Sequence, residues 1–231
     1  QRGAKETTDL EELASLSNVI IMCVTNTPVA VDIISEIAPH LQKKTMIIDI
    51  TTHKADGSIQ IFQKLNSLDI MYVESPVMGG PVQAEEGVLG AIVGCEEKDF
   101  EFAKEILMNF CKDVFYFGPV GMGAKAKLVN NFLSLGTATF VIETLKAADK
   151  LGIDLKKLYD VAKLGSGNSG ALNRMAKKAI NNDYKGYIFS VNNTLKDLTY
   201  INELLKDMPN AEKLSSVTKS FYEKAKAKGY G

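Results

Sequence analysis

The stretch "GPVGMGAKAKLVNNF", residues 118–132, is where the sequence changes its pattern. Before Gly118, short β-rich runs alternate with amphipathic helical stretches, and after it strands become hard to find. Strand–helix alternation is typical of a largely parallel, doubly wound sheet. We therefore expect an α/β domain over residues 1–118 and an all-helical domain over residues 119–231.

The expected strands of the first domain are continuously apolar and do not alternate with polar residues. They are residues 19–24, 46–50, 69–73, 90–94 and 113–117. A strand with one face in water shows alternation, so these runs predict a sheet that helices cover on both sides.

The second domain opens with a helical pattern of roughly 28 residues that ends at Gly152, a residue type that favours a helix C-terminus. Residues 131–142 of this helix carry no charge, so we expect this part to be buried on all sides. Asp154 and Asn210 stand where N-caps of later helices are expected.

Composition excludes several classes of function. The net charge is −1, and no Lys/Arg cluster is interleaved with aromatic residues, which disfavours nucleic-acid binding. The uncharged run 131–142 is too short to cross a bilayer, so no membrane partner is expected. The two histidines lack metal-ligand spacing, so we expect no metal site. Cys23, Cys95 and Cys111 are interpreted as buried, reduced thiols, which favours a cytoplasmic protein.

Lys127 and Asn131 lie four residues apart and therefore share one face of the long helix. Burying an unpaired ammonium costs several kcal/mol unless its pKa falls or a partner is found. The simpler alternative is a lysine whose charged end reaches solvent from the first turns of the helix. Lys125 is the better candidate for that structural role.

The segment around Lys127 resembles the catalytic segment of the β-hydroxyacid dehydrogenases. The family pattern G-x-x-G-x-G-x-x-x-K-x-x-x-N falls on Gly118, Gly121, Gly123, Lys127 and Asn131. Three further segments are similar to family motifs and occur in the same order: "IIDITTHKAD" (47–56), "VESPVMGGPVQAEEGVLGAIVGC" (73–95) and "FSVNNTLKDL" (189–198). The resemblance covers nearly the whole chain. It implies a partial doubly wound, Rossmann-like sheet followed by an all-α domain with a long interdomain helix.

By this resemblance Lys127 is the catalytic general acid–base, and Asn131, also catalytic, holds the substrate by its amide. Gly79 and Gly80 would let backbone N–H groups approach a substrate carboxylate. Met78 stands where relatives usually have a small hydroxyl residue, and its thioether cannot donate a hydrogen bond. Asn168 is a further expected substrate contact.

The resemblance also implies NAD or NADP as the cofactor. Val24 and Thr25, at the end of one strand, and Thr52, beyond the next, would contact it, and Lys196 would reach toward the nicotinamide. His53, next to Thr52, is interpreted as a solvated loop residue.

The sequence begins just before the strand at 19–24 and does not contain the glycine-rich turn that binds pyrophosphate. We interpret it as a fragment of a complete enzyme, inactive by itself; the alternative is a protein that has lost its cofactor half. The segment that separates NAD from NADP preference is not in the sequence either.

The expected function is hydride transfer between a nicotinamide dinucleotide and a short 3-hydroxy acid or its semialdehyde, by a homo-oligomer acting on small molecules. The alternatives are a non-catalytic oligomerisation module and an NADPH-dependent aldehyde or imine reductase of the same family.

Overall fold

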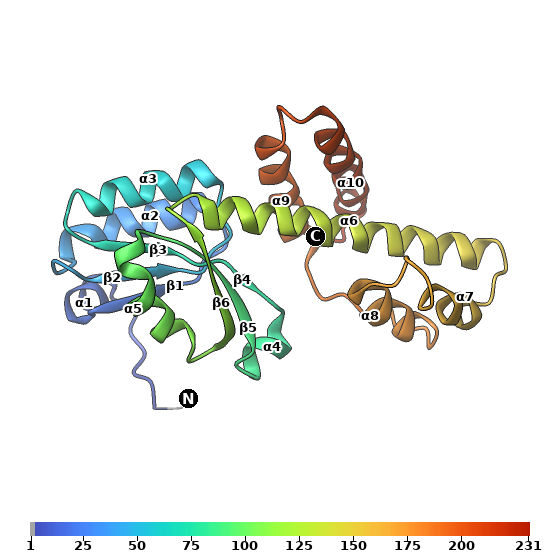
Figure 1. The fold of residues 1–231 in the computed structure, drawn as a ribbon, viewed down its shortest axis with the longest axis horizontal. Helices are drawn as coiled ribbons and strands as arrows, with labels where there is room; N and C mark the ends of the chain where they lie inside the picture. Colours follow the sequence, from blue (N-terminus) through green and yellow to red (C-terminus); the bar gives the residue numbers. More distant parts are fainter. Residues whose placement is uncertain (1–2) are drawn as a thin grey trace. The chain divides into compact units, whose positions relative to one another are not determined.

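The structure is a computed structural model that describes residues 3–231. The chain divides into two compact units, Gln1–Lys127 and Leu128–Gly231 (Figure 1). The first unit contains all the strands of the described chain, and the second is helical. The mixed α/β fold with a helical C-terminal region agrees with the fold class predicted from the sequence.

The first unit is a sheet with helices on its faces. Within residues 3–127 its elements are α1 (Leu10–Leu16), β1 (Val19–Met22), α2 (Thr27–Ile37), the 3-10 turn η1 (Ala38–His40), β2 (Met46–Asp49), α3 (Ala55–Asn66), β3 (Met71–Glu74), β4 (Val77–Met78), α4 (Pro81–Glu85), β5 (Leu89–Gly94), α5 (Glu97–Leu107) and β6 (Cys111–Gly118), followed by the start of α6 (Met122–Lys150).

Strands β1, β2 and β3 are parallel neighbours, as the alternation of strands and helices predicts. Strand β5 pairs antiparallel with β3 and with the short β4, and β6 runs parallel to β5. The link from β4 to β5 contains only the five-residue helix α4, which is too short for the crossover that a parallel pair requires. The chain therefore reverses direction at this point.

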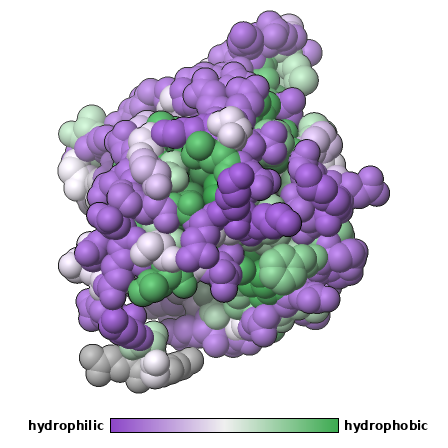
Figure 2. Space-filling model, turned by 90° about the vertical axis from the view of Figure 1, so that its left-hand side faces the viewer, coloured by the Kyte–Doolittle hydropathy of each residue, from purple (hydrophilic) through white to green (hydrophobic). Residues whose placement is uncertain are grey.

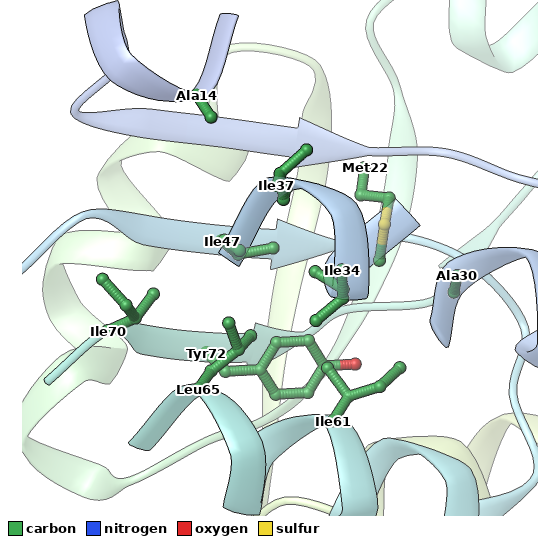
Figure 3. Close-up of a cluster of buried hydrophobic side chains, with 10 residues drawn as sticks. All are labelled: Ala14, Met22, Ala30, Ile34, Ile37, Ile47, Ile61, Leu65, Ile70 and Tyr72. Carbon is green, nitrogen blue, oxygen red and sulfur yellow. The ribbon is translucent and has the colours of Figure 1, made fainter. Parts of the chain in front are cut away.

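Two apolar cores lie on the opposite faces of the sheet. Alternate residues of β2 point to opposite sides, so Ile47 packs in one core while Met46 and Ile48 pack in the other. The first core joins α1, α2 and α3 to the parallel strands (Figure 3). The second joins α5 to the other face. Burial on both faces explains why residues 46–48 of β2 are all apolar.

Strand β6 departs from this arrangement. Its side chains Phe115, Tyr116 and Phe117 are exposed, so the expectation of helices on both sides is wrong for this strand. Among the described strands it pairs only with β5, and a strand at an edge has fewer covering neighbours. Cys23 is also exposed, whereas Cys95 and Cys111 are buried as predicted.

The side of the molecule in Figure 2 is mainly hydrophilic, with hydrophobic side chains in small areas.

The second unit packs helices around the long helix α6. Its further elements are α7 (Leu155–Ala162), α8 (Gly170–Ala179), α9 (Val191–Leu204) and α10 (Pro209–Ala227). Leu128 and Leu135 of α6 lie in one apolar cluster with residues of α9, and Ala138 and Val141 lie in a second with residues of α7 and α8.

Helix α6 is not buried on all sides, which corrects the expectation for residues 131–142. The side chains of Leu133 and Phe140 are 70% and 72% exposed. By length and composition alone α6 could cross a membrane, but core helices of soluble proteins pass the same test. An uncharged run in a helix therefore does not require burial on every side.

N-caps were predicted for two of the later helices, at Asp154 and at Asn210. Asp154 caps α7 as predicted, because its carboxylate accepts from the backbone N–H of Lys157 at 2.9 Å. The prediction for Asn210 is wrong: Met208 is the N-cap residue of α10, and Asn210 follows Pro209 inside the helix. Proline is well tolerated at the first helical position, and it moves the start upstream.

Candidate active site

Lys127 lies at the end of the first unit, with its side chain directed at the β4 strand. The residue is 8% exposed, and its ammonium donates to the backbone carbonyl of Val77 at 2.8 Å. The Met78 sulfur lies 3.3 Å from the same nitrogen. The simpler reading of this residue, a lysine that reaches solvent, does not hold, whereas Lys125 is exposed.

The start of α6 is fixed to the sheet by a buried carboxylate. Glu74, at the end of β3, is fully buried, and its Oε1 accepts from the backbone N–H groups of Gly121 at 2.6 Å and Gly123 at 2.8 Å. Burial raises the pKa of Glu74, and these hydrogen bonds oppose the rise. A negative group at a helix N-terminus also interacts favourably with the helix dipole.

The glycine pair after β4 forms a tight turn. Gly79 has φ +124°, and a Cβ there would lie 2.7 Å from the side chain of Leu89, so the position requires glycine. The Gly80 N–H donates to Gln83 Oε1 at 2.8 Å. An amide oxygen therefore occupies the position where the resemblance places a substrate carboxylate oxygen, and Gln83 would have to move before that N–H could bind substrate.

The carboxyl ends of β1 and β2 meet at one edge of the sheet. The Val24 N–H donates to Thr51 Oγ1 at 3.1 Å, which joins the two loops. Thr25 is exposed and Thr52 is half-buried at this edge. In doubly wound sheets nucleotides bind outside the carboxyl ends of the strands. The residues present fit this part of a nicotinamide dinucleotide.

A buried polar network supports this edge. His53 is 1% exposed, so its interpretation as a solvated loop residue is wrong. Its Nε2 lies 2.6 Å from Asp49 Oδ2, and its Nδ1 lies 3.2 Å from Thr27 Oγ1. The Tyr72 hydroxyl donates to the same Asp49 oxygen at 3.1 Å. Burial and the Asp49 charge raise the pKa of Tyr72 well above its ordinary value, which keeps it a donor.

In the second unit, Asn131 and Lys196 share a buried carboxylate. Asn131 is 6% exposed and donates from Nδ2 to Asp197 Oδ2 at 2.7 Å. The Lys196 ammonium lies 3.2 Å from Asp197 Oδ1 and 5.8 Å from the centre of the Tyr200 ring. Asp197 thus orients both residues that the resemblance assigns to substrate and cofactor.

Asn168 lies elsewhere in the second unit, in the exposed loop between α7 and α8. Its side-chain oxygen accepts from Asn173 Nδ2 at 3.0 Å, and Asn173 in turn accepts from the Tyr159 hydroxyl at 2.9 Å. The structure gives it no contact with the Asn131 group. Its role in substrate binding stays a prediction.

Two buried acidic residues, Glu74 and Asp49, were not predicted from the sequence, and the burial of His53 was predicted wrongly. The signal that could have found them is an acidic residue at the end of an otherwise apolar strand, which occurs both at Asp49 and at Glu74. Charged groups are rarely buried without partners, so each position implies donors nearby. The donors Tyr72, Gly121 and Gly123 could not be predicted, since they come from distant segments.

An α/β unit with a loop edge suited to a nucleotide, together with a buried lysine, is compatible with a nicotinamide-dependent oxidoreductase. Comparison with known proteins refines this. Residues 1–118 match the sequence model for the NAD binding domain of 6-phosphogluconate dehydrogenase. Residues 121–231 match the one described as NAD-binding of NADP-dependent 3-hydroxyisobutyrate dehydrogenase. The chain belongs to the β-hydroxyacid dehydrogenase family, and its function is that of an NAD(P)-dependent dehydrogenase.

Individual proteins agree with this assignment. L-threonate dehydrogenase from Haemophilus influenzae is 29% identical over 196 residues, which are 84% of this chain and 65% of that protein. 2-(Hydroxymethyl)glutarate dehydrogenase from Eubacterium barkeri is 25% identical over 234 residues, 100% of this chain and 77% of that protein. The solved structure of 3-hydroxyisobutyrate dehydrogenase from Mycobacterium tuberculosis with L-serine has the same fold, with a TM-score of 0.86 at 23% identity, over 96% of this chain and 78% of that one.

Proposed function

We propose that this dehydrogenase oxidises a short 3-hydroxy acid to its semialdehyde, or catalyses the reverse reduction, with Lys127 as the general acid–base. The observation that supports this most directly is the burial of the Lys127 ammonium against a neutral carbonyl oxygen. We further propose that residues 1–118 bind nucleotide and residues 119–231 contribute substrate contacts and subunit contacts.

The chemistry assigned to Lys127 is a proton transfer. When NAD(P) is bound, it supplies or accepts the hydride. Lys127 gives a proton to the substrate oxygen during reduction and removes one from the hydroxyl during oxidation. The ammonium donates to the Val77 carbonyl, which fixes the position of the nitrogen. Holding the reacting groups in place in this way lowers the entropic part of the barrier.

The substrate class is inferred from the relatives and from Met78. Threonate and 2-(hydroxymethyl)glutarate, the compounds in the relatives' names, both carry a carboxylate and a hydroxyl on the third carbon. Asn131 keeps its amide oxygen and one N–H for such a substrate after donating to Asp197. Because the Met78 thioether lies beside Lys127 and cannot donate, we expect a substituent on the second carbon that is apolar at this side.

The test is to replace Lys127 with alanine in the full-length protein and to measure turnover with a panel of 3-hydroxy acids and semialdehydes. We expect kcat to fall by at least about a thousandfold, because proton transfer and the placement of the substrate oxygen are lost together. Dinucleotide binding, measured by fluorescence titration, should persist.

Lys125→Ala is the matched control, since Lys125 is an exposed lysine two residues away on the same helix. It should keep its kcat. A Lys127→Ala enzyme with near-normal kcat would rule out the general acid–base role.

We also propose that the protein works as a homo-oligomer. Two helices of the second unit expose apolar stripes: Val129, Leu133 and Phe140 on α6, and Leu214, Val217 and Phe221 on α10. The spacing within each stripe places its members on one helix face. Apolar side chains aligned in this way favour burial against another protein surface, and the same surface on a second copy is the simplest partner.

A further inference from the structure

Glu74 is an acidic residue buried at the end of β3. Its side chain is fully buried, and Oε2 has no hydrogen-bond partner among the described residues. A buried carboxylate with an unsatisfied oxygen is costly, and a neutral side chain could accept from the same donors.

The other well-capped helices show what a purely local cap looks like. Helices α2, α7, α8 and α9 are each capped by a short polar side chain that accepts from the backbone N–H three residues later. The start of α6 is instead held by Glu74, which is 47 residues upstream of Gly121 and lies on β3. A local cap stabilises a helix end, whereas this contact also fixes where α6 begins relative to the sheet.

The same short segment binds α6 at a second point. Three residues after Glu74, the Val77 carbonyl accepts from the Lys127 ammonium at 2.8 Å. Residues 74–78 therefore hold both the backbone at the start of α6 and a side chain one turn further along. Strand β5 supports both points, because Gly94 pairs with Glu74 and Ala91 pairs with Val77.

The backbone packs closely around Glu74, and two neighbouring positions have no space for a side chain. A Cβ on Gly94 would lie 2.2 Å from Glu74 Oε1, and one on Gly123 would lie 2.9 Å from the backbone nitrogen of Gly94. Neither approach is possible for a residue with a side chain. Two glycines thus let the helix come close enough for its N–H groups to reach the carboxylate.

We propose that Glu74 is a positioning residue for Lys127: by anchoring the first turn of α6 to the end of β3, it sets the place of the Lys127 ammonium opposite the Val77 carbonyl. The inference rests on the proposed general acid–base role of Lys127. Glu74 itself is not assigned any contact with substrate or cofactor.

The experiment compares Glu74→Gln and Glu74→Ala with the wild-type enzyme at saturating substrate. Gln keeps an acceptor oxygen but loses the charge that strengthens both hydrogen bonds, and Ala removes the anchor. We expect kcat to fall about tenfold for Gln and about a hundredfold for Ala, because small displacements of a catalytic group cost rates of this size. The KM for the dinucleotide should stay within about twofold, since its binding does not depend on the position of Lys127.

Loss of folded protein is separated from loss of positioning by expressing kcat per dinucleotide-binding site, counted by titration. The primary deuterium isotope effect, measured with dinucleotide deuterated at the transferred position, gives a second readout that a merely structural defect would not change. It should rise in both variants as the chemical step slows. Glu105→Gln, which alters an exposed glutamate on α5, is the matched control and should behave as wild type.

The outcomes separate this inference from the proposed function. If Lys127→Ala is inactive while both Glu74 variants keep kcat per site and the isotope effect of the wild type, Glu74 does not position Lys127 and the inference is overturned. If Lys127→Ala keeps its activity, the acid–base role fails first, whatever the Glu74 variants do. Should Glu74→Ala not fold, the Glu74→Gln enzyme alone decides the question by the same two readouts.

Discussion

Glu74 is a carboxylate that the fold keeps from water, and its Oε1 accepts the backbone hydrogen bonds from Gly121 and Gly123. Burial is the largest cause that raises its pKa above the ordinary value of 4.5, and hydrogen bonds to it act in the opposite direction. The folded state therefore binds the Glu74 proton more tightly than the unfolded state does. The stability this contributes is complete below the unfolded-state pKa and is lost as pH rises through the folded-state pKa.

Replacing Glu74 with glutamine should remove this pH dependence, because the amide does not ionise. We expect the free energy of unfolding of Glu74→Gln, relative to wild type, to increase as pH rises from about 4 to about 8, by about 1.4 kcal/mol for each unit of pKa shift. Urea denaturation at a series of pH values measures it. A difference that stays constant over this range would show that the folded-state pKa is not raised, and Glu105→Gln gives the baseline.

At the level of single residues, the sequence predicted those whose chemistry is recognisable along the chain. Lys127 and Asn131 are both buried, as their place beside an apolar helix indicated. Asp49 and Glu74 were missed and His53 was misinterpreted, because partners such as Thr27 for His53 and Gly123 for Glu74 lie 26 and 49 positions away and no spacing rule connects them. Whether a charged residue is buried depends on tertiary contacts that a single sequence does not display.

At the level of elements, the two glycines of α6 offer a matched pair of substitutions. A Cβ on Gly123 would lie 2.9 Å from the Gly94 nitrogen and 3.0 Å from the Ile92 carbonyl oxygen, whereas a Cβ on Gly136 would meet nothing within 4 Å. Gly123→Ala should lower the free energy of unfolding by about 1–3 kcal/mol, since backbone atoms must shift. Gly136→Ala should raise it by about 0.5–1 kcal/mol, because alanine favours a helix interior.

Thermal or urea unfolding of the two variants checks this prediction, and the opposite signs within one helix provide the control. Equal effects would mean that close approach to β5 does not explain the glycine at 123. If Glu74 also positions Lys127, Gly123→Ala should lower kcat as well, while Gly136→Ala should not.

The long helix also shows where element prediction stops. Its length was predicted as roughly 28 residues and is 29, and Gly152 follows its end with φ +67°, as expected for a C-terminal glycine. Its burial was mispredicted, because an uncharged run records the absence of charge and not the presence of neighbours. The antiparallel direction of β5 was likewise hidden, since the strand signal of residues 90–94 carries no information about direction.

At the level of the whole molecule, the sequence pattern changes from strands to helices at Gly118. The boundary between the two compact units falls later in the chain, between Lys127 and Leu128. The helix that carries Lys127, the proposed general acid–base, belongs to both, with its first turns in the first unit. Sequence patterns detect the change of element type, whereas compactness depends on which residues contact each other, so the two criteria differ by about two turns of helix.

The apolar stripe on α6 gives a prediction for the assembly. Leu133 and Phe140 are 70% and 72% exposed and lie on one helix face, so a glutamate at either position would place a charge in the proposed subunit contact without disturbing the apolar core of its own chain. Burying such a charge without a partner is costly, and we expect Leu133→Glu and Phe140→Glu each to weaken self-association by at least about tenfold. Sedimentation velocity over a range of protein concentrations measures the shift, and thermal melts confirm that the variants fold.

Leu164→Glu is the control, because Leu164 is 88% exposed and lies outside both stripes. A wild-type protein that sediments as a monomer at every concentration, or stripe variants that associate as strongly as the control, would show that this face does not bind a second copy.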